Sequence, residues 1–243
     1  WTQPDAFDPD IAYAEYQGGN MNRVNMKQGT SVGIQPKGAA GDEKLRYNWN
    51  TPIVIGAKNK KNMYAAAQYL YKSTDRGANW TKISPDLTTN DKRKQEQEKS
   101  GGLSMDVTSA ENHCTIFTIA ESPLDENVIW VGTDDGNLQY TTDGGKTWIS
   151  VTANLPVKGN TYTVAEDYVK ADLLFAGTQF GLFFTADGGK EWIKFKNGLP
   201  TTTVMDIEIQ KRENDLVVAT HGRSFWILDD ITTLYQLADA ANK

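Results

Sequence analysis

The sequence has 243 residues, of which 39% are hydrophobic, 10% aromatic and 23% charged, a composition typical of a folded globular protein. Its formal net charge of −6 argues against a nucleic-acid or anionic-membrane surface, and no apolar run approaches the roughly 20 residues of a membrane span. A single cysteine, Cys114, leaves the redox compartment undecided. The residues after Trp1 lack the positively charged region and the apolar region of a signal peptide. We therefore expect any signal peptide to have been removed or to lie outside this segment.

A short apolar strand that ends in small residues recurs five times along the chain. The copies are Ile11–Ala14, Met63–Ala66, Ile129–Gly132, Leu174–Gly177 and Val217–Thr220. They predict five repeated units at approximately 1–40, 41–85, 111–154, 155–198 and 199–237 in one continuous region. In the first unit Trp1–Pro9 is a poor strand because it holds two prolines, so we expect no regular innermost strand there.

One turn motif occurs three times in the sequence. It consists of a hydroxyl residue, any residue, Asp, any residue, Gly, two further residues and Trp. Its Asp accepts hydrogen bonds from nearby backbone N–H groups, its Gly takes a positive φ, and its Trp re-enters the core. The motif therefore predicts a structural hairpin corner. Its members are Ser73, Asp75, Gly77 and Trp80, then Thr141, Asp143, Gly145 and Trp148, then Thr185, Asp187, Gly189 and Trp192.

The first interval between these motifs carries an insertion at 86–110. Asn90–Lys99 reads as a short solvated helix with Asn90 as its cap and Gly101-Gly102 as its stop. We interpret the insertion as a surface excursion rather than a binding element.

The fourth unit reads as the strands Thr161–Ala165, Leu173–Gly177, Leu182–Thr185 and Trp192–Phe195. The fifth aligns with it without a gap, which places Asp230 opposite Asp187 and predicts the strands Val204–Ile209, Leu216–Thr220, Phe225–Leu228 and Thr233–Leu237. Four short strands in a period of 43 or 44 residues indicate an all-β fold, a β-propeller of four-stranded antiparallel blades. Because an innermost strand is missing, we expect part of a larger propeller. Expressed alone, this segment should be poorly soluble or associate with itself or with a partner.

The turn motifs resemble the Asp-box, or BNR, repeats of sialidases, xyloglucan-type endoglucanases and the sortilin propeller. The phrases Tyr16–Met21, Arg46–Pro52, Glu96–Ser104 and Ala219–Arg223 resemble large secreted bacterial proteins labelled sortilin-like or BNR-repeat glycosyl hydrolases. The resemblance implies a secreted, periplasmic or cell-surface location. It also implies another blade between Trp148 and Leu155, where this chain passes directly from one unit to the next.

Glycosidases use paired carboxylates, but the box aspartates recur at the same corner of successive blades and are interpreted as structural. Acidic residues on or after the innermost strands are better catalytic candidates, because these strands line the central channel of a propeller. They are Glu121, Glu166, Asp167, Asp206 and Glu208. No arginine cluster or tyrosine lies in a sialidase context, so that activity is the least favoured.

Other ligand chemistry is sparse in the sequence. His113, Cys114 and His221 are the only soft metal-ligand candidates, so we expect no metal and no cofactor. Six aromatic residues are candidates for sugar stacking or, by the favoured interpretation, for the core between blades: Trp49, Tyr64, Tyr69, Trp130, Phe180 and Trp226.

The sequence therefore leads to two hypotheses about function. The first is a secreted binding or interaction module that holds a polysaccharide or protein ligand at the channel mouth and contacts other blades or chains of a larger assembly. The alternative is a part of a glycoside hydrolase, similar to endoglucanases or xyloglucanases, whose cleft is completed by other parts of the protein.

Overall fold

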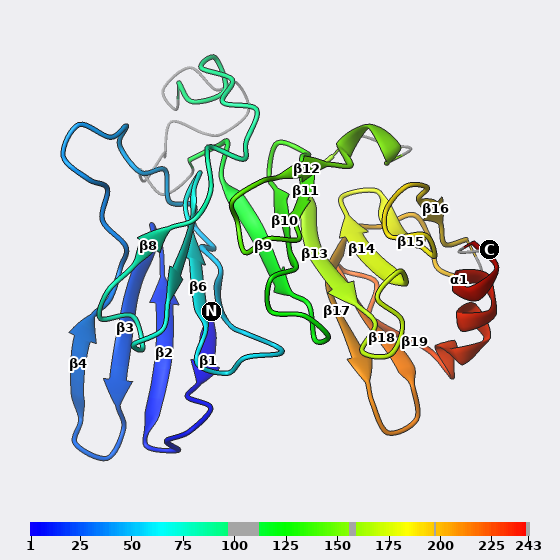
Figure 1. Cartoon of the computed structure of the whole chain (residues 1–243), viewed down its shortest axis with the longest axis horizontal. Coiled ribbons are helices and arrows are strands. Elements are labelled where there is room, and N and C mark those ends of the chain that lie inside the picture. Colours follow the sequence, from blue (N-terminus) through cyan, green and yellow to red (C-terminus); the bar gives the residue numbers. More distant parts are fainter. Residues whose placement is uncertain (97–111, 156–158, 197, 242–243) are drawn as a thin grey trace.

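The computed structural model describes residues 1–96, 112–155, 159–196 and 198–241, which form five antiparallel sheets in chain order (Figure 1). Sheet 1 contains β1 (Thr2–Pro4), β2 (Ile11–Tyr16), β3 (Asn20–Asn25) and β4 (Thr30–Gly33). Sheet 2 contains β5 (Ile53–Ile55), β6 (Met63–Ala66), β7 (Leu70–Ser73) and β8 (Thr81–Lys82). Sheet 3 contains β9 (Ile116–Glu121), β10 (Ile129–Thr133), β11 (Leu138–Thr141) and β12 (Ile149–Ser150). The short helix η2 (Thr152–Asn154) follows it.

Sheet 4 contains β13 (Thr161–Glu166), β14 (Leu174–Thr178), β15 (Gly181–Thr185) and β16 (Ile193–Lys194). Sheet 5 has three strands, β17 (Val204–Gln210), β18 (Asp215–Thr220) and β19 (Phe225–Leu228), and is followed by η3 (Ile231–Leu234) and α1 (Tyr235–Ala241). Each sheet is a meander of neighbouring strands, so the predicted all-β class and antiparallel pairing are confirmed.

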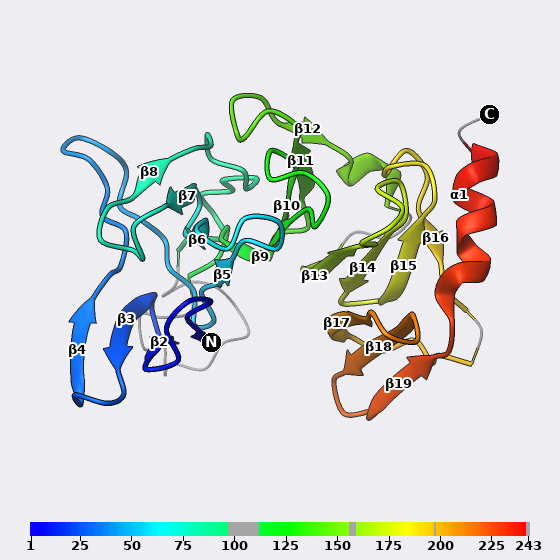
Figure 2. The same ribbon diagram turned by 60° about the horizontal axis from the view of Figure 1, so that its bottom comes forward.

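The five sheets stand in an arc that is open between sheets 1 and 5 (Figure 2). The first strand of each sheet faces the middle of the arc, and β13 contacts both β9 and β17. None of the described helices is long and apolar enough to cross a membrane.

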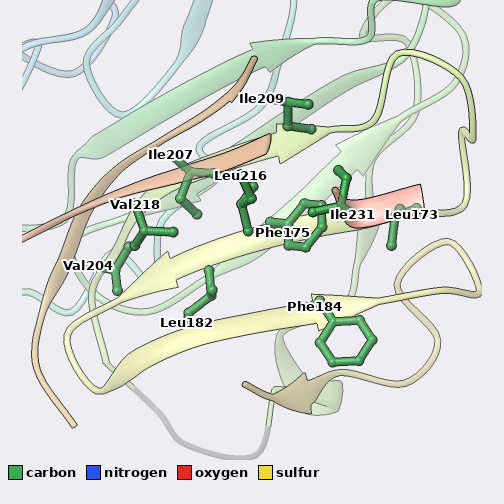
Figure 3. Close-up of a cluster of buried hydrophobic side chains, with 10 residues drawn as sticks. All are labelled: Leu173, Phe175, Leu182, Phe184, Val204, Ile207, Ile209, Leu216, Val218 and Ile231. Carbon is green, nitrogen blue, oxygen red and sulfur yellow. The ribbon is translucent and has the colours of Figure 1, made fainter. Parts of the chain in front are cut away.

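Hydrophobic side chains fill the space between consecutive sheets. Sheet 4 buries both of its faces, because Leu174, Ala176 and Phe183 join a cluster with Trp130 of sheet 3. The alternate residues of the same strands pack against sheet 5 (Figure 3). That second cluster consists of Leu173, Phe175, Leu182, Phe184, Val204, Ile207, Ile209, Leu216, Val218 and Ile231. The alternation explains why these strands read as continuous apolar runs.

Three predictions about local structure were wrong. Residues 233–237 are helical, in η3 and α1, because the Asp230 carboxylate accepts the N–H of Thr232 at 3.1 Å and caps the turn. Asn90 has a φ of 51° and residues 92–95 form turns, so no helix begins there, and the predicted stop at 101–102 lies outside the described residues. The first unit has an innermost strand, β1, which tolerates Pro4 at its last position.

The gap-free alignment of the fifth unit with the fourth is also wrong by one residue in its second strand. Ala219 pairs with Phe225 as Gly177 pairs with Leu182, so Ala219 is the counterpart of Gly177. The turn between β18 and β19 is one residue longer than the turn between β14 and β15. After this turn the residues of the two units are therefore again 43 positions apart. Asp230 therefore still corresponds to Asp187.

Candidate functional site

The same β-bulge occurs in the innermost strands of sheets 3, 4 and 5. Phe117 of β9, Tyr162 of β13 and Met205 of β17 each stand unpaired where the register with the second strand of the sheet shifts. A bulge redirects the side chain of its extra residue and bends the strand. Three consecutive sheets thus offer a large side chain at equivalent positions.

These three side chains line one pocket of about 300 Å³ together with Trp1 and Asn50, and we call it the axial pocket. Three of its residues lie on the innermost strands of sheets 3, 4 and 5, whereas Trp1 directly precedes β1 and Asn50 lies shortly before β5. The Phe117 and Tyr162 rings stack with their centroids 5.6 Å apart and their planes at 29°. Trp1 is 44% exposed and Met205 42%, so the pocket offers accessible apolar surface where the sheets converge.

The catalytic candidate Glu121 forms hydrogen bonds to sheet 2. One carboxylate oxygen accepts the backbone N–H groups of Lys58 and Asn59 at 2.9 and 3.0 Å. The other accepts the Tyr64 hydroxyl at 2.6 Å and the Asn62 amide at 2.8 Å. With four donors in place, this buried carboxylate joins two sheets.

Glu166 occupies the equivalent position at the end of β13 and forms hydrogen bonds to sheet 3. Its carboxylate accepts the hydroxyl of Ser122 and, at 3.2 Å, the indole N–H of Trp130. Burial raises the pKa of Glu166 to about 7, although these two hydrogen bonds lower it. Glu166 is therefore poised between the acid and carboxylate forms near neutral pH.

The remaining three acidic candidates have different environments. Asp167 is fully buried and accepts the N–H groups of Val169 and Lys170 at 2.8 and 2.7 Å, so it closes a turn. Asp206 and Glu208 are exposed on β17. Desolvation by neighbouring groups and the charge of Asp206 raise the pKa of Glu208.

Three of the five candidates meet in a second pocket, of about 200 Å³, which we call the acidic pocket. Glu121, Glu166 and Glu208 line it together with Lys211 and apolar residues of four innermost strands, whereas Asp167 and Asp206 do not line it. Since Glu121 is saturated with donors, Glu166 and Glu208 are the acids here with capacity for a ligand.

The three turn motifs form closed hydrogen-bond networks in the hairpin between the third and fourth strands. The Thr141 hydroxyl donates to Asp143 at 2.7 Å and accepts the N–H of Gly145 at 3.0 Å, while Asp143 accepts the N–H of Thr147 at 2.9 Å. The other two motifs form the same bonds, from Ser73 to Asp75 and from Thr185 to Asp187.

The motif carboxylates are stabilised in their charged form. Hydrogen bonds from Asn79 lower the pKa of Asp75 to about 2. For Asp143 the N–H and hydroxyl of Thr147 lower the pKa. Burial raises the pKa of Asp187, but the N–H of Glu191 and the hydroxyl of Thr185 outweigh it and the net shift is downward.

The predicted metal-ligand candidates do not come together. His113 lies 3.4 Å from the Asp134 carboxylate, and that hydrogen bond raises the pKa of His113. Cys114 is fully buried, whereas His221 is an exposed residue in the turn between β18 and β19. In the described parts of the chain, no group of three or more His, Cys, Asp or Glu side chains could hold a metal ion.

None of the six aromatic residues proposed for sugar stacking lines the axial pocket. Tyr64 and Trp130 are buried between sheets and donate hydrogen bonds to Glu121 and Glu166. The residues that do line the axial pocket were not among the candidates from the sequence: Trp1, Asn50, Phe117, Tyr162 and Met205. A signal was present, because a large side chain follows the first residue of three innermost strands, at Ile116-Phe117, Thr161-Tyr162 and Val204-Met205.

The sequence matches no family model and no curated protein. Solved structures resemble it over nearly the whole chain. The xyloglucanase of family GH74 from Xanthomonas campestris has a TM-score of 0.65 at 15% identity, covering 93% of this chain and 35% of that one. The extracellular domain of a B. thetaiotaomicron protein described as a hybrid two component system has a TM-score of 0.63 at 15% identity, with coverages of 96% and 27%. YCF48 bound to D1 peptide has a TM-score of 0.54 at 12% identity, with coverages of 94% and 62%.

These neighbours are β-propeller domains, and the predicted fold class is confirmed: the chain is an all-β assembly of propeller blades. It spans about a third or less of the first two of these proteins. At such identities the likeness concerns the fold, and any activity has to be argued from the residues of this chain.

Proposed function

We propose that this chain is a carbohydrate-binding propeller module and that the axial pocket is its ligand site. The observation that carries the proposal is the convergence of exposed Trp1 and Met205 with the stacked rings of Phe117 and Tyr162. Aromatic faces bind apolar surfaces such as the C–H faces of sugar rings, and Asn50 adds a polar group for orientation. The fold likeness to xyloglucanases supports a polysaccharide as the class of ligand.

We further propose that the protein acts outside the cytoplasm, and that the twelve motif residues form structural Asp boxes. The likeness to an extracellular domain supports the first statement. The saturated hydrogen bonds of Asp143 and its counterparts support the second, because these carboxylates already hold their own turns.

A glycoside hydrolase is the second candidate function, and one specific observation favours it. Glu166, whose pKa is about 7, lines the same pocket as Glu208, and glycosidases combine a general acid of raised pKa with a second carboxylate. Both oxygens of Glu166 already accept hydrogen bonds from sheet 3, however, which disfavours this second function.

A binding titration with soluble xyloglucan and with an unsubstituted β-glucan, followed by Trp fluorescence, tests the proposal. We expect Tyr162→Ala to weaken binding by roughly five- to thirtyfold, since truncating an aromatic anchor of a binding site costs on the order of 1–2 kcal/mol. Phe225→Ala is the matched control, because Phe225 is exposed and lies outside the axial pocket. Equal affinity of the wild type and the Tyr162 variant would contradict the assignment.

The same polysaccharides separate binding from catalysis. We expect no release of reducing ends by the wild type. Release that is abolished by Glu166→Gln, in a variant that still binds, would establish the hydrolase alternative instead. A peptide ligand is the other outcome to consider, since a neighbour of this fold binds a peptide. Binding of peptides at the axial pocket in preference to both glucans would contradict the carbohydrate proposal.

A further inference from the structure

One backbone hydrogen bond recurs in sheets 1 to 4, between the third strand and the residue after the fourth. The carbonyl of Leu70 accepts the N–H of Ile83 at 2.9 Å, and the carbonyl of Leu182 accepts the N–H of Phe195 at 2.9 Å. The other two pairs are Met21 with Ile34 at 2.8 Å and Leu138 with Val151 at 2.9 Å. In every pair the donor is an apolar residue that packs into the core between sheets.

Phe225 of β19 is the fifth member of this series, because it pairs with Ala219 as Leu182 pairs with Gly177. Among the described residues no strand pairs with the outer edge of β19, so the donor to the Phe225 carbonyl is missing from sheet 5.

The chain after β19 is held away from this edge. It turns at Asp230 and continues as η3 and α1 to the outer side of β16 (Figure 2). Tyr235 donates to Asp167 at 3.2 Å, and Lys170 pairs with Asp239, so both interactions anchor the helix to the loop after β13. The helix therefore leaves the fourth-strand position of sheet 5 empty.

The exposed edge carries both main-chain groups and apolar side chains. Thr220 donates its N–H to the Ser224 carbonyl, and in an antiparallel pair such inward bonds alternate along the strand. The N–H and C=O groups of Phe225 and Ile227 consequently point outward. Their side chains are 74% and 63% exposed and lie on the face of sheet 5 opposite the cluster shared with sheet 4. A strand edge with unpaired main-chain groups is a template for another strand.

Sheets 2, 3 and 4 show which kind of strand fits such an edge. In each of them the Trp that ends the turn motif is followed by two residues and then by an apolar residue: Trp80–Ile83, Trp148–Val151 and Trp192–Phe195. The two middle residues form the short fourth strand and lie largely at the surface, whereas the last residue donates the recurring bond.

We propose that the outer edge of β19 is a strand-acceptor site, at which a separate polypeptide adds an extended segment of the pattern Trp-x-x-apolar as the fourth strand of sheet 5. The segment pairs antiparallel with β19, and the N–H of its apolar residue donates to the Phe225 carbonyl. Main-chain hydrogen bonds supply the affinity, while the Trp and the apolar residue supply the specificity.

The test uses a synthetic peptide, Lys-Glu-Trp-Ile-Lys-Phe-Lys, which copies residues 190–196 of the chain. We expect saturable binding by isothermal calorimetry. N-methylation at Phe removes the N–H that corresponds to that of Phe195, so it should weaken binding at least tenfold. N-methylation at the second Lys is the matched control, because the alternation directs that N–H away from the acceptor strand.

A variant of the protein gives an independent readout. Ile227→Pro removes an outward N–H, a position where an edge strand tolerates proline, so the melting temperature should stay close to that of the wild type while peptide binding is lost. Ile227→Thr keeps the N–H and should retain binding. Absence of saturable binding, or equal affinity of the two N-methylated peptides, would overturn the proposal. Light scattering that shows a dimer in the wild type and a monomer in Ile227→Pro would also overturn it, because the partner would then be a second copy.

Discussion

The Glu166 carboxyl provides a quantitative test of how the sheets are held together. Its pKa is raised from 4.5 to about 7, so between these values the unfolded chain loses a proton that the folded chain keeps. The folded state therefore binds more protons, and its stability falls as the pH rises through this window. A shift of about 2.5 units corresponds to about 3 kcal/mol, which is an upper bound for the stability lost between pH 4.5 and pH 8.

Glu166→Gln removes this titration, because the amide mimics the protonated acid. Its oxygen can accept the Trp130 indole N–H, while its NH₂ group faces the Ser122 hydroxyl as the protonated oxygen of the acid does. We expect the variant to exceed the wild type by less than about 1 kcal/mol at pH 5 and by up to about 3 kcal/mol at pH 8.

Urea unfolding at pH 5, 6, 7 and 8 measures both proteins. The comparison has to be the difference between them, because His113 acts in the same direction. Its hydrogen bond to Asp134 raises its pKa, so the stability that it contributes is present at low pH and is lost as the pH rises through its folded value. A difference between wild type and variant that stays constant from pH 5 to pH 8 would refute the assignment of the shift to burial of Glu166.

Three further predictions follow from the same contacts. Glu121→Gln should lower the unfolding free energy at pH 8 by about 1–3 kcal/mol, because each carboxylate oxygen accepts two of the four donors and an NH₂ in place of either oxygen would face both. Unchanged urea midpoints would contradict the conclusion that Glu121 joins the two sheets. Asp143→Ala should lower the melting temperature without reducing polysaccharide binding, whereas Asp229→Ala, which alters an exposed residue outside the motifs, should change neither. Gly177→Ala should lower the free energy of unfolding by about 1–3 kcal/mol in thermal or urea unfolding, because the added Cβ would lie 2.5 Å from the Thr163 side chain. Gly33→Ala is the control, because a Cβ at this position would meet no atom within 4 Å. Equal effects of the two substitutions would count against close packing between sheets.

The carbohydrate hypothesis and the strand-acceptor hypothesis concern different parts of the molecule and can fail separately. The axial pocket lies where the innermost strands converge, whereas β19 is the outer strand of sheet 5. A Tyr162 variant should therefore bind the peptide normally, and an Ile227→Pro variant should bind polysaccharide normally.

The sequence by itself determined the repeat, the strand order and the turn chemistry. These features are local: the bonds of the Thr141–Trp148 motif join residues two to four positions apart, so the spacing of hydroxyl, Asp and Gly can be read directly. Apolar runs such as Leu173–Gly177 identified strands for a similar reason, since both faces of the corresponding strand β14 are buried between sheets. The same local reasoning failed at residues 233–237, where the cap at Asp230 and burial of Ile231 favour a helix.

Only the tertiary structure decided what the acidic and aromatic residues do. Glu121 meets Tyr64 across 57 residues of sequence, and Glu166 meets Trp130 across 36, so no spacing rule identified these carboxylates as links between sheets. The axial pocket likewise depends on a bulge in three separate strands that brings Phe117, Tyr162 and Met205 together. Hydrogen bonding within a turn depends on neighbouring residues, whereas burial and the pKa shift that it causes depend on which sheets the arc places side by side.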